Sequence, residues 1–104
     1  METQRLRAIE NRIRRIKATL ATIGEMRPGT LSRQFRKSAS GTLAYWQLSY
    51  THRMKSRTDY VRPDCVPQTR RQVQAYKKFK KLVDEWVDLA IEYAKLKAKL
   101  GSDN

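Results

Sequence analysis

Few side chains in this sequence of 104 residues are able to act as a nucleophile, a general base or a metal ligand. His52 is the only histidine and Cys65 is the only cysteine, so an internal disulfide and a site built from several cysteines are both excluded. Neither residue lies in a recognisable hydrolase or transferase signature. The stretch PGTLS at residues 28–32 is a turn signal and not a glycine-rich phosphate loop. We therefore expect no enzyme activity, no cofactor and no bound metal.

Two features of the sequence still admit a chemical role. Cys65 lies just before a predicted helix, whose N-terminus can lower the pKa of a thiol, although a small half-buried residue is the simpler interpretation. Asp84, Asp88 and Glu92 follow an i, i+4, i+8 spacing and would share one face of a helix. Because lysines accompany them on the same helix, we expect solvated ion pairs there rather than a metal site.

The strongest feature of the composition is its positive charge. Twenty-three lysines and arginines stand against ten acidic residues, which gives a net charge of +13. Such a charge attracts polyanions, and nucleic acid is the commonest polyanion that an intracellular basic protein meets. An anionic membrane surface, an acidic protein or a role in solubility alone are the weaker alternatives. Residues 28–63 are the most one-sided part, because Asp59 is their only acid against seven cations.

A second basic run begins the last predicted helix, where cations precede all the acids. Cations near a helix N-terminus oppose the helix dipole, so this order indicates that the basic end has a use beyond helix stability. We expect the cations of the middle segment and of this helix start to contact phosphates. The candidates are Arg33, Arg36, Lys37, Arg53, Lys55, Arg57, Arg62, Arg70, Arg71, Lys77, Lys78 and Lys81.

A helix is predicted over residues 3–24, with Thr3 as its N-cap and with Gly24 and then Pro28–Gly29 closing the segment. Its apolar residues follow steps of three and four, which is the narrow seam of a coiled-coil-like helix. A helix this short and this basic needs a packing partner. The seam residues are Leu6, Ile9, Ile13, Ile16, Leu20 and Ile23.

A longer helix is predicted over residues 65–100, with Asp64 as N-cap, Pro67 in the first turn and Gly101 at the end. Its apolar face is wide, which suits a helix that covers a sheet near its start and pairs with a helix further along. The seam comprises Phe79, Leu82, Trp86, Leu89, Tyr93, Leu96 and Leu100. A second row comprises Tyr76, Val83, Val87, Ala90 and Ala94.

The segment between the helices has a different pattern, typical of strands. AYWQLSYT at residues 44–51 and RTDYVR at residues 57–62 alternate two faces around the turn HRMKS. GTLSRQFR at residues 29–36 is a third candidate strand, with Leu31, Arg33 and Phe35 on one face. A lone two-stranded hairpin is barely stable in water, so the third strand or the long helix must support it.

The alternation assigns each aromatic side chain of the hairpin to a face. Trp46, Leu48 and Tyr50 are expected to pack on the long helix, and Tyr45 and Tyr60 are the two candidates for exposed rings. Exposed rings beside arginine would favour single-stranded or RNA targets, whereas a basic hairpin without them would favour phosphate contacts on a duplex. On the second strand, Thr58 and Tyr60 share one face, and Asp59 and Val61 share the other.

Three blocks of the sequence carry a resemblance to a known family. They read RPGTLSRQFRK, YWQLSYTHRMKSRTDYVRPD and VQAYKKFKKLVDEWVDLAIEYAKL, and together they cover residues 27–96. The chain resembles an uncharacterised bacterial and archaeal family of small basic proteins that are often found among mobile elements. Members of that family often carry a small cysteine cluster, but the corresponding stretch RKSASGTLA at residues 36–44 has none. The resemblance implies an association with mobile elements, but it implies no particular activity.

These patterns predict an α+β fold in a single domain, with a helix at 3–24, a β-rich basic segment at 30–62 and a long helix at 65–100. The two helical seams would pair with each other or with a second copy in a homodimer. We expect a non-enzymatic, cytoplasmic protein that binds DNA or RNA and has no membrane segment. The alternative is a protein-interaction module or ribonucleoprotein subunit that docks a larger nuclease, transposase or defence complex through its helical seams.

Overall fold

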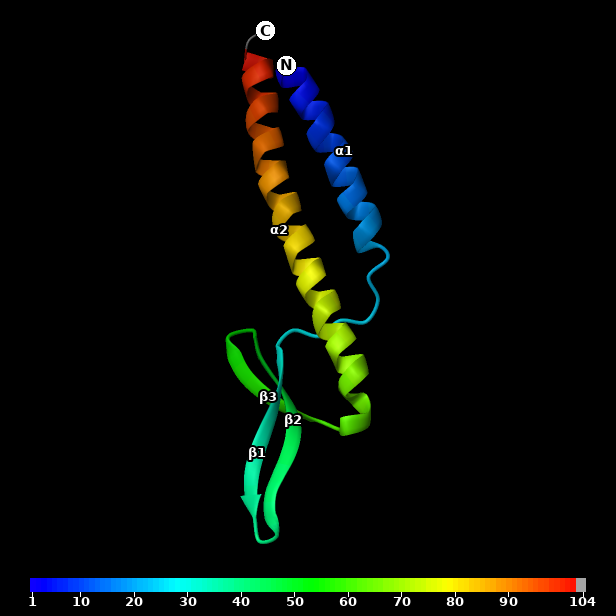
Figure 1. The fold of residues 1–104 in the computed structure, drawn as a ribbon. Helices are drawn as coiled ribbons and strands as arrows, with labels where there is room; N and C mark the ends of the chain where they lie inside the picture. The colour runs from blue at the N-terminus through cyan, green and yellow to red at the C-terminus, as the bar shows by residue number, and fades with distance from the viewer. Residues whose placement is uncertain (103–104) are drawn as a thin grey trace. The chain divides into compact units, whose positions relative to one another are not determined.

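A computed structural model describes residues 1–102 and confirms the α+β fold class. The elements are α1 (Glu2–Leu20), β1 (Thr30–Ser38), β2 (Gly41–His52), β3 (Lys55–Val61), the 3-10 turn η1 (Pro63–Cys65) and α2 (Val66–Ser102), as Figure 1 shows. The described chain forms two compact units. We call them the helical unit, residues 1–23 with 78–102, and the sheet unit, residues 24–77.

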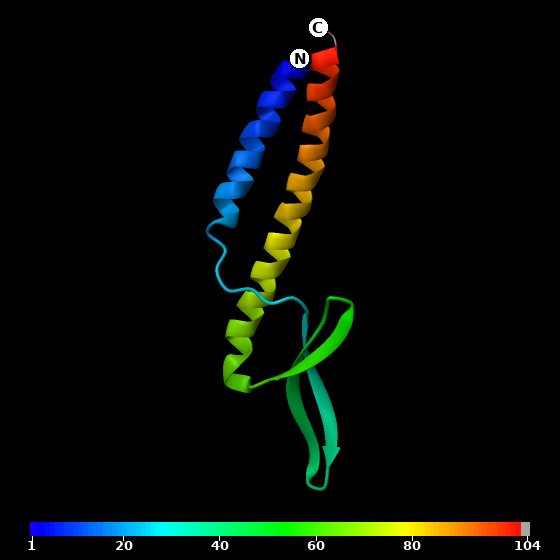
Figure 2. The ribbon, with the colours of Figure 1, turned by 180° about the vertical axis from the view of Figure 1, so that it is seen from behind.

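In the helical unit, α1 pairs with the second half of α2, and the two helices run side by side in both Figure 1 and Figure 2. Arg5 binds Glu92 and Arg12 binds Glu85, so a step of seven along α1 matches a step of seven in the opposite direction along α2. The pairing is therefore antiparallel. Ile9 on the α1 seam is fully buried in the middle of this pair. The two predicted seams thus meet within one chain.

The ends of α1 differ from the prediction. Met1 is the N-cap and no side chain caps the helix, so the assignment of Thr3 as N-cap was wrong. The helix ends at Leu20, four residues before the predicted boundary, because the amides of Thr22 and Ile23 bond to carbonyls only three residues back. The hydroxyl of Thr22 reinforces this tighter turn by donating a 2.7 Å hydrogen bond to the carbonyl of Thr19. Neither α1 nor any other described helix is long and apolar enough to cross a membrane.

The sheet unit holds three antiparallel strands in the order β1-β2-β3, so the third strand predicted before the hairpin is confirmed. Its core is a cluster of Leu48, Val61, Val66 and Val73. Val66 and Val73 belong to the first two turns of α2, which therefore cover one face of the sheet. Leu31, Trp46, Tyr50 and Cys65 pack around this cluster as half-buried side chains.

The strand register gives the sheet a covered face and an open face. Leu48 lies opposite Leu31 on β1 and opposite Asp59 on β3, and Trp46 lies opposite Val61. Side chains alternate along a strand, so these residues all belong to the face that α2 covers. The predicted division of β3, with Asp59 and Val61 on one face and Thr58 and Tyr60 on the other, agrees with this register. We use the names covered face and open face below.

The start and end of α2 also correct the prediction. The chain enters α2 through the turn η1, whose N-cap is Arg62, and Asp64 lies inside that turn rather than capping α2. Pro67 occupies the first turn of α2, as expected, since its missing N–H has no intrahelical partner there. Gly101 does not end the helix, which continues to Ser102.

Candidate nucleic-acid interface

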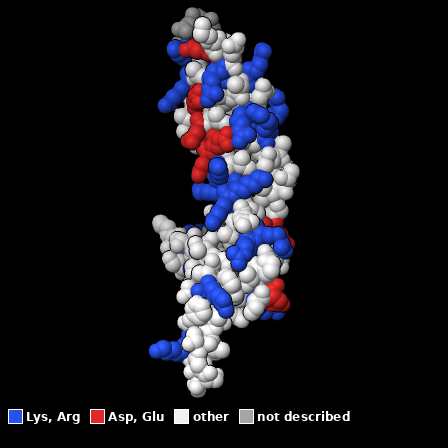
Figure 3. Space-filling model, in the orientation of Figure 1, with Lys and Arg blue, Asp and Glu red and all other residues white. Residues whose placement is uncertain are grey.

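The two units differ in how their charge is balanced. The sheet unit, residues 24–77, contains eleven basic and three acidic residues, a net charge of +8. The remaining residues contain twelve basic and seven acidic residues, a net charge of +5. On the face drawn in Figure 3, most of the acidic surface lies over the paired helices. The sheet unit is therefore the more one-sided of the two.

Two acids of α2 in the helical unit, Glu85 and Glu92, are bound by arginines of α1. Arg12 donates two hydrogen bonds to Glu85, at 2.6 and 2.8 Å, and Arg5 donates two to Glu92, at 2.6 and 2.7 Å. These hydrogen bonds hold the pKa of each carboxyl group below its usual range. Asp84 lies 3.8 Å from Lys80 one turn away. The expectation of an ion pair beside lysines of the same helix is confirmed for Asp84, whereas Glu92 pairs with Arg5 of α1. No metal-binding cluster occurs among the described residues.

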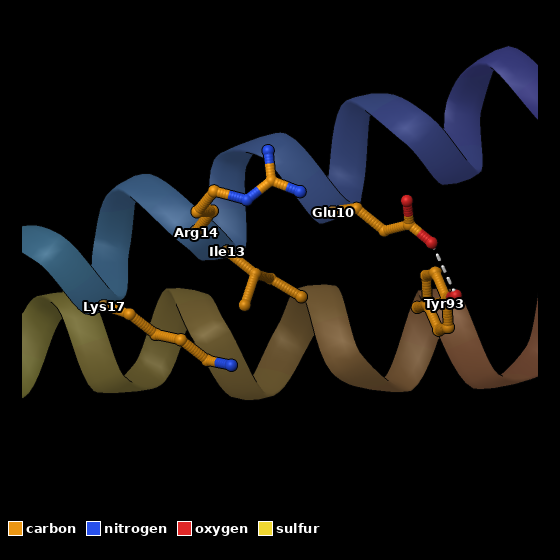
Figure 4. Close-up of a pocket in the computed structure, with 5 residues that line it drawn as sticks. All are labelled: Glu10, Ile13, Arg14, Lys17 and Tyr93. Atoms are coloured by element: carbon orange, nitrogen blue, oxygen red, sulfur yellow. Dashed lines mark hydrogen bonds between the residues drawn. The ribbon is translucent and has the colours of Figure 1, made fainter.

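A recess between α1 and α2 shows how the helix pair is held together. It has a volume of about 240 Å³ and is lined by Glu10, Ile13, Arg14 and Lys17 of α1 and by Tyr93 of α2. Figure 4 shows Glu10 pointing toward Tyr93. The hydroxyl of Tyr93 donates a 2.7 Å hydrogen bond to Glu10, and this bond raises the pKa of the tyrosine. Glu10 is the only carboxylate that lines this recess, and it already accepts a hydrogen bond from Tyr93. We therefore interpret the recess as part of the contact between α1 and α2.

The hairpin of β2 and β3 gathers three of the predicted cations around one hollow. Arg53, Lys55 and Arg57, together with Tyr50 and His52, line a recess of about 360 Å³ beside the turn. We call these five residues the tip recess. The register explains the grouping, because His52 lies opposite Lys55 and Tyr50 opposite Arg57. None of the three cations forms an ion pair with another residue of the range 1–102, so their charge is available to a ligand.

The turn at the end of this hairpin has an unfavourable backbone. Arg53 has a φ of 53° and Met54 a φ of 65°, so both central residues adopt the left-handed conformation of a type I′ turn. Asn-Gly is the usual sequence for this turn, and a larger side chain costs about 1–2 kcal/mol at each position. Met54 is also 91% exposed, so burial does not offset this cost. A hairpin with Asn-Gly in place of Arg53 and Met54 would therefore be more stable.

A second group of predicted cations surrounds Trp46. Arg33 is the register partner of Trp46 on β1, and the guanidinium of Arg70 on α2 lies 5.7 Å from the Trp46 ring. Arg33 also lies 5.5 Å from the ring of Phe35. We call Arg33, Phe35, Trp46 and Arg70 the Trp46 cluster. Trp46 precedes His52 by six residues on β2, or roughly 20 Å of strand, so the cluster and the tip recess are separate groups.

The other predicted cations join neither group. By alternation, Lys37 shares the covered side with Arg33, whereas Arg36 belongs to the open face, 5.9 Å from the ring of Tyr45. Arg62 is engaged with Asp64 at 3.7 Å and donates a hydrogen bond to the Cys65 sulfur, which raises the pKa of the guanidinium. Arg71 and Lys77 are exposed on the sheet-unit part of α2, and Lys78 and Lys81 lie in its helical-unit part.

Arg27 forms contacts within the sheet unit that the sequence analysis did not predict. Its guanidinium binds Asp59 at 2.9 Å, and its backbone N–H donates to the carbonyl of Gln72 on α2. Nearby, Gln72 and Gln68 both donate to Glu25 and hold the pKa of that carboxyl group below its usual range. Arg27 and Asp59 are 32 residues apart in sequence, so no local pattern indicates the pair.

The two tyrosines singled out in the sequence both belong to the open face. Tyr60 is 66% exposed, and Tyr45 is half-buried. Tyr50, in contrast, packs against the core on the covered face, as predicted. Exposure of an aromatic ring is therefore confirmed for Tyr60 and is only partial for Tyr45.

Comparisons with protein-family models, with curated proteins and with solved structures give no match to this chain. Its function is therefore inferred from the placement of its own residues. The tip recess, the Trp46 cluster and the open face all belong to the sheet unit.

Proposed function

We propose that this chain is a non-enzymatic nucleic-acid-binding protein whose sheet unit contacts the phosphate backbone. One observation carries the proposal: each of the three acids of the sheet unit already has a partner in the fold. Asp59 is bound by Arg27, Asp64 lies beside Arg62, and Glu25 accepts hydrogen bonds from two glutamines. The tip recess and the Trp46 cluster therefore present cations that no carboxylate of residues 1–102 neutralises.

Phosphate is the ligand that such cations favour. Arginine presents a planar set of donors that matches phosphate oxygens, and lysine adds a compact charge. Contacts of this kind fix a protein on the nucleic-acid backbone without reading the bases. Arg71 and Lys77 on α2 would extend the contact surface of the sheet unit, and Lys78 and Lys81 continue the basic stretch along α2.

The test is a binding titration with a labelled oligonucleotide, followed by fluorescence anisotropy. The triple variant R53Q/K55Q/R57Q removes the charge of the tip recess, and we expect it to weaken binding at least tenfold at low salt. The matched control is R7Q/R15Q/K95Q, which removes three exposed charges from the helical unit. Equal losses in both variants would show that binding follows net charge alone and would overturn the assignment to the sheet unit.

A second candidate function is a protein-interaction module, and the exposed apolar side of α2 favours it. Val83, Val87, Ala90, Ile91 and Ala94, with Trp86, line a groove of about 370 Å³. Val87 and Ile91 are 51% and 50% exposed, which is unusual for neighbouring branched apolar residues on one helix.

This groove would dock a larger protein of a nuclease, transposase or defence complex, in keeping with a mobile-element setting. A nucleic-acid-binding subunit of such a complex would satisfy both candidates. The variant V87K/I91E keeps the net charge of α2 unchanged and should abolish docking while leaving oligonucleotide binding intact. Loss of oligonucleotide binding in this variant would contradict the division of roles between the two units.

A further inference from the structure

The open face of the sheet carries few charged side chains. Apart from the cation Arg36, its strand residues are neutral, and most are serines, threonines and glutamines. Neighbouring hydroxyl groups lie close to each other across the strands, such as Thr51 and Ser56 at 3.2 Å. Tyr45 and Tyr60 are the aromatic residues among them. Such a face has flat rings, hydrogen-bonding groups and no negative charge.

From this arrangement we propose that the open face binds the unpaired bases of a single-stranded nucleic acid, with Tyr45 and Tyr60 as stacking platforms. The inference rests on the proposed function, and it names the form of nucleic acid that the same sheet unit takes. Protein sheets commonly bind single strands in this way, with two or three bases stacked on aromatic side chains. Stacking tolerates any sequence because every base has a π-face.

The register places the two tyrosines at a useful separation. Tyr45 lies opposite Gln34 on β1, and Tyr60 lies opposite Gln47 on β3. Because Gln47 follows Tyr45 by two residues on β2, the tyrosines are diagonal neighbours, with backbones about 7–8 Å apart. Two rings at this separation can each hold a different base of one strand.

The groups around the tyrosines are free to bind a ligand. Neither tyrosine hydroxyl forms a hydrogen bond with another residue of the range 1–102, and the same holds for the side-chain amide of Gln47. An amide both donates and accepts, so Gln47 suits the edge of a base beside a stacked ring. Arg36, whose guanidinium lies 5.9 Å from the Tyr45 ring, supplies a positive charge for a phosphate.

A core role does not account for the Tyr60 side chain. The core cluster belongs to the covered face, and Tyr60 is 66% exposed on the other side of the strand. Val87 of α2 offers a comparison outside the proposed nucleic-acid contacts, since it is 51% exposed and belongs to the helical unit. Substitution of Val87 removes an exposed apolar side chain and leaves the open face unchanged.

The experiment compares wild-type protein and variants in anisotropy titrations with labelled 12-nucleotide oligo(U), 12-nucleotide oligo(dT) and a 12-base-pair duplex. We expect both single strands to bind more tightly than the duplex. Y45T/Y60T should lose roughly tenfold or more in affinity for single strands, because stacking contributes at each base. Y60F should stay within about threefold of wild type, because it keeps the ring, and V87T should bind like wild type.

Three results would count against these ideas, and they can be told apart. Single-strand affinity that is unchanged in Y45T/Y60T overturns the open-face inference, and so does equal or tighter binding of the duplex by wild type. Absence of binding to all three oligonucleotides overturns the proposed function itself. Circular dichroism melts of each variant show whether a loss comes from unfolding. The single variant Y60T removes the ring of the more exposed tyrosine and preserves the test if the double variant does not fold.

Discussion

The guanidinium of Arg27 donates a 2.9 Å hydrogen bond to the carboxylate of Asp59, which is the only acid in the three strands. The backbone N–H of Arg27 also donates to the carbonyl of Gln72, so one residue contacts both β3 and α2. The contact has two consequences. It anchors the segment before β1 to the sheet unit, and it neutralises the negative charge that would oppose a bound phosphate.

Replacement of Asp59 by asparagine tests the electrostatic part of this relationship. The pair is about 40% exposed, so D59N should cost less than about 1 kcal/mol in the free energy of unfolding. It also raises the net charge of the sheet unit and releases Arg27. We expect oligonucleotide binding to tighten by about two- to fivefold at low salt, with the gain shrinking as salt is added. Weaker binding in a folded D59N protein would contradict a phosphate-binding sheet unit.

The turn of the β2–β3 hairpin gives a prediction in which stability and binding change in opposite directions. R53N/M54G supplies the residues that a type I′ turn favours, so it should stabilise the sheet unit by about 1–2 kcal/mol. The same variant removes a cation of the tip recess and should weaken nucleic-acid binding. M54G alone is the control, because it relieves strain at Met54 and leaves all charges in place.

Urea unfolding of these turn variants is best followed in a W86F background, where Trp46 reports on the sheet unit alone. A loss of stability in R53N/M54G would show that the left-handed turn is not strained. Unchanged binding would remove Arg53 from the interface.

The two glycines with positive φ should respond very differently to alanine. Gly29 and Gly41 have φ values of 124° and 126°, so alanine is strained at either position. A Cβ at Gly29 would also lie 2.6 Å from the carbonyl oxygen of Ser49, whereas a Cβ at Gly41 would meet nothing within 4 Å. We therefore expect G29A to destabilise the sheet unit by a further 1–3 kcal/mol or so relative to G41A. Equal urea midpoints would contradict the close approach of Gly29 to β2.

The paired helices should lose stability in acid. Hydrogen bonds from Arg12 and Arg5 lower the pKa of Glu85 and Glu92 below the ordinary glutamate value of 4.5. A carboxyl group with a lowered pKa in the folded state stabilises that state above the ordinary value. This stabilisation is then lost as the pH falls from about 4.5 through the lowered values.

Thermal melts between pH 7 and pH 2, monitored by helical circular dichroism, measure this acid sensitivity. E85Q/E92Q should be less stable than wild type at neutral pH and should show a smaller further loss in acid. If wild type and variant lose stability in parallel throughout this range, the two ion pairs do not stabilise the helix pair.

The fold was predictable from the sequence where a repeating pattern acted over a whole element. The steps of three and four in α1 and α2, and the alternation in β2, each repeat often enough to identify an element and the side that it buries. Leu48 and Trp46 were placed correctly for this reason. Element ends were less predictable, because Thr3 and Gly101 are good capping residues that this chain uses inside helices.

The candidate site was less predictable than the fold, because its features depend on pairings between distant residues. The sequence identified the cations of the middle segment, but the register of β2 and β3 decides that Arg53, Lys55 and Arg57 share a recess. Similarly, Asp84, Asp88 and Glu92 were expected in ion pairs beside lysines of their own helix. Glu92 instead binds Arg5 of α1, and Glu85, for which no ion pair was predicted, binds Arg12.

The central claim is that cations of the sheet unit displace salt ions from a nucleic-acid backbone, and the salt dependence of binding tests it most directly. If about six phosphates are neutralised, the logarithm of the association constant should fall with the logarithm of salt concentration with a slope between about −4 and −5. R53Q/K55Q/R57Q should flatten this slope by about 2–3. Binding whose strength is independent of salt, or a slope that the triple variant leaves unchanged, would contradict the claim.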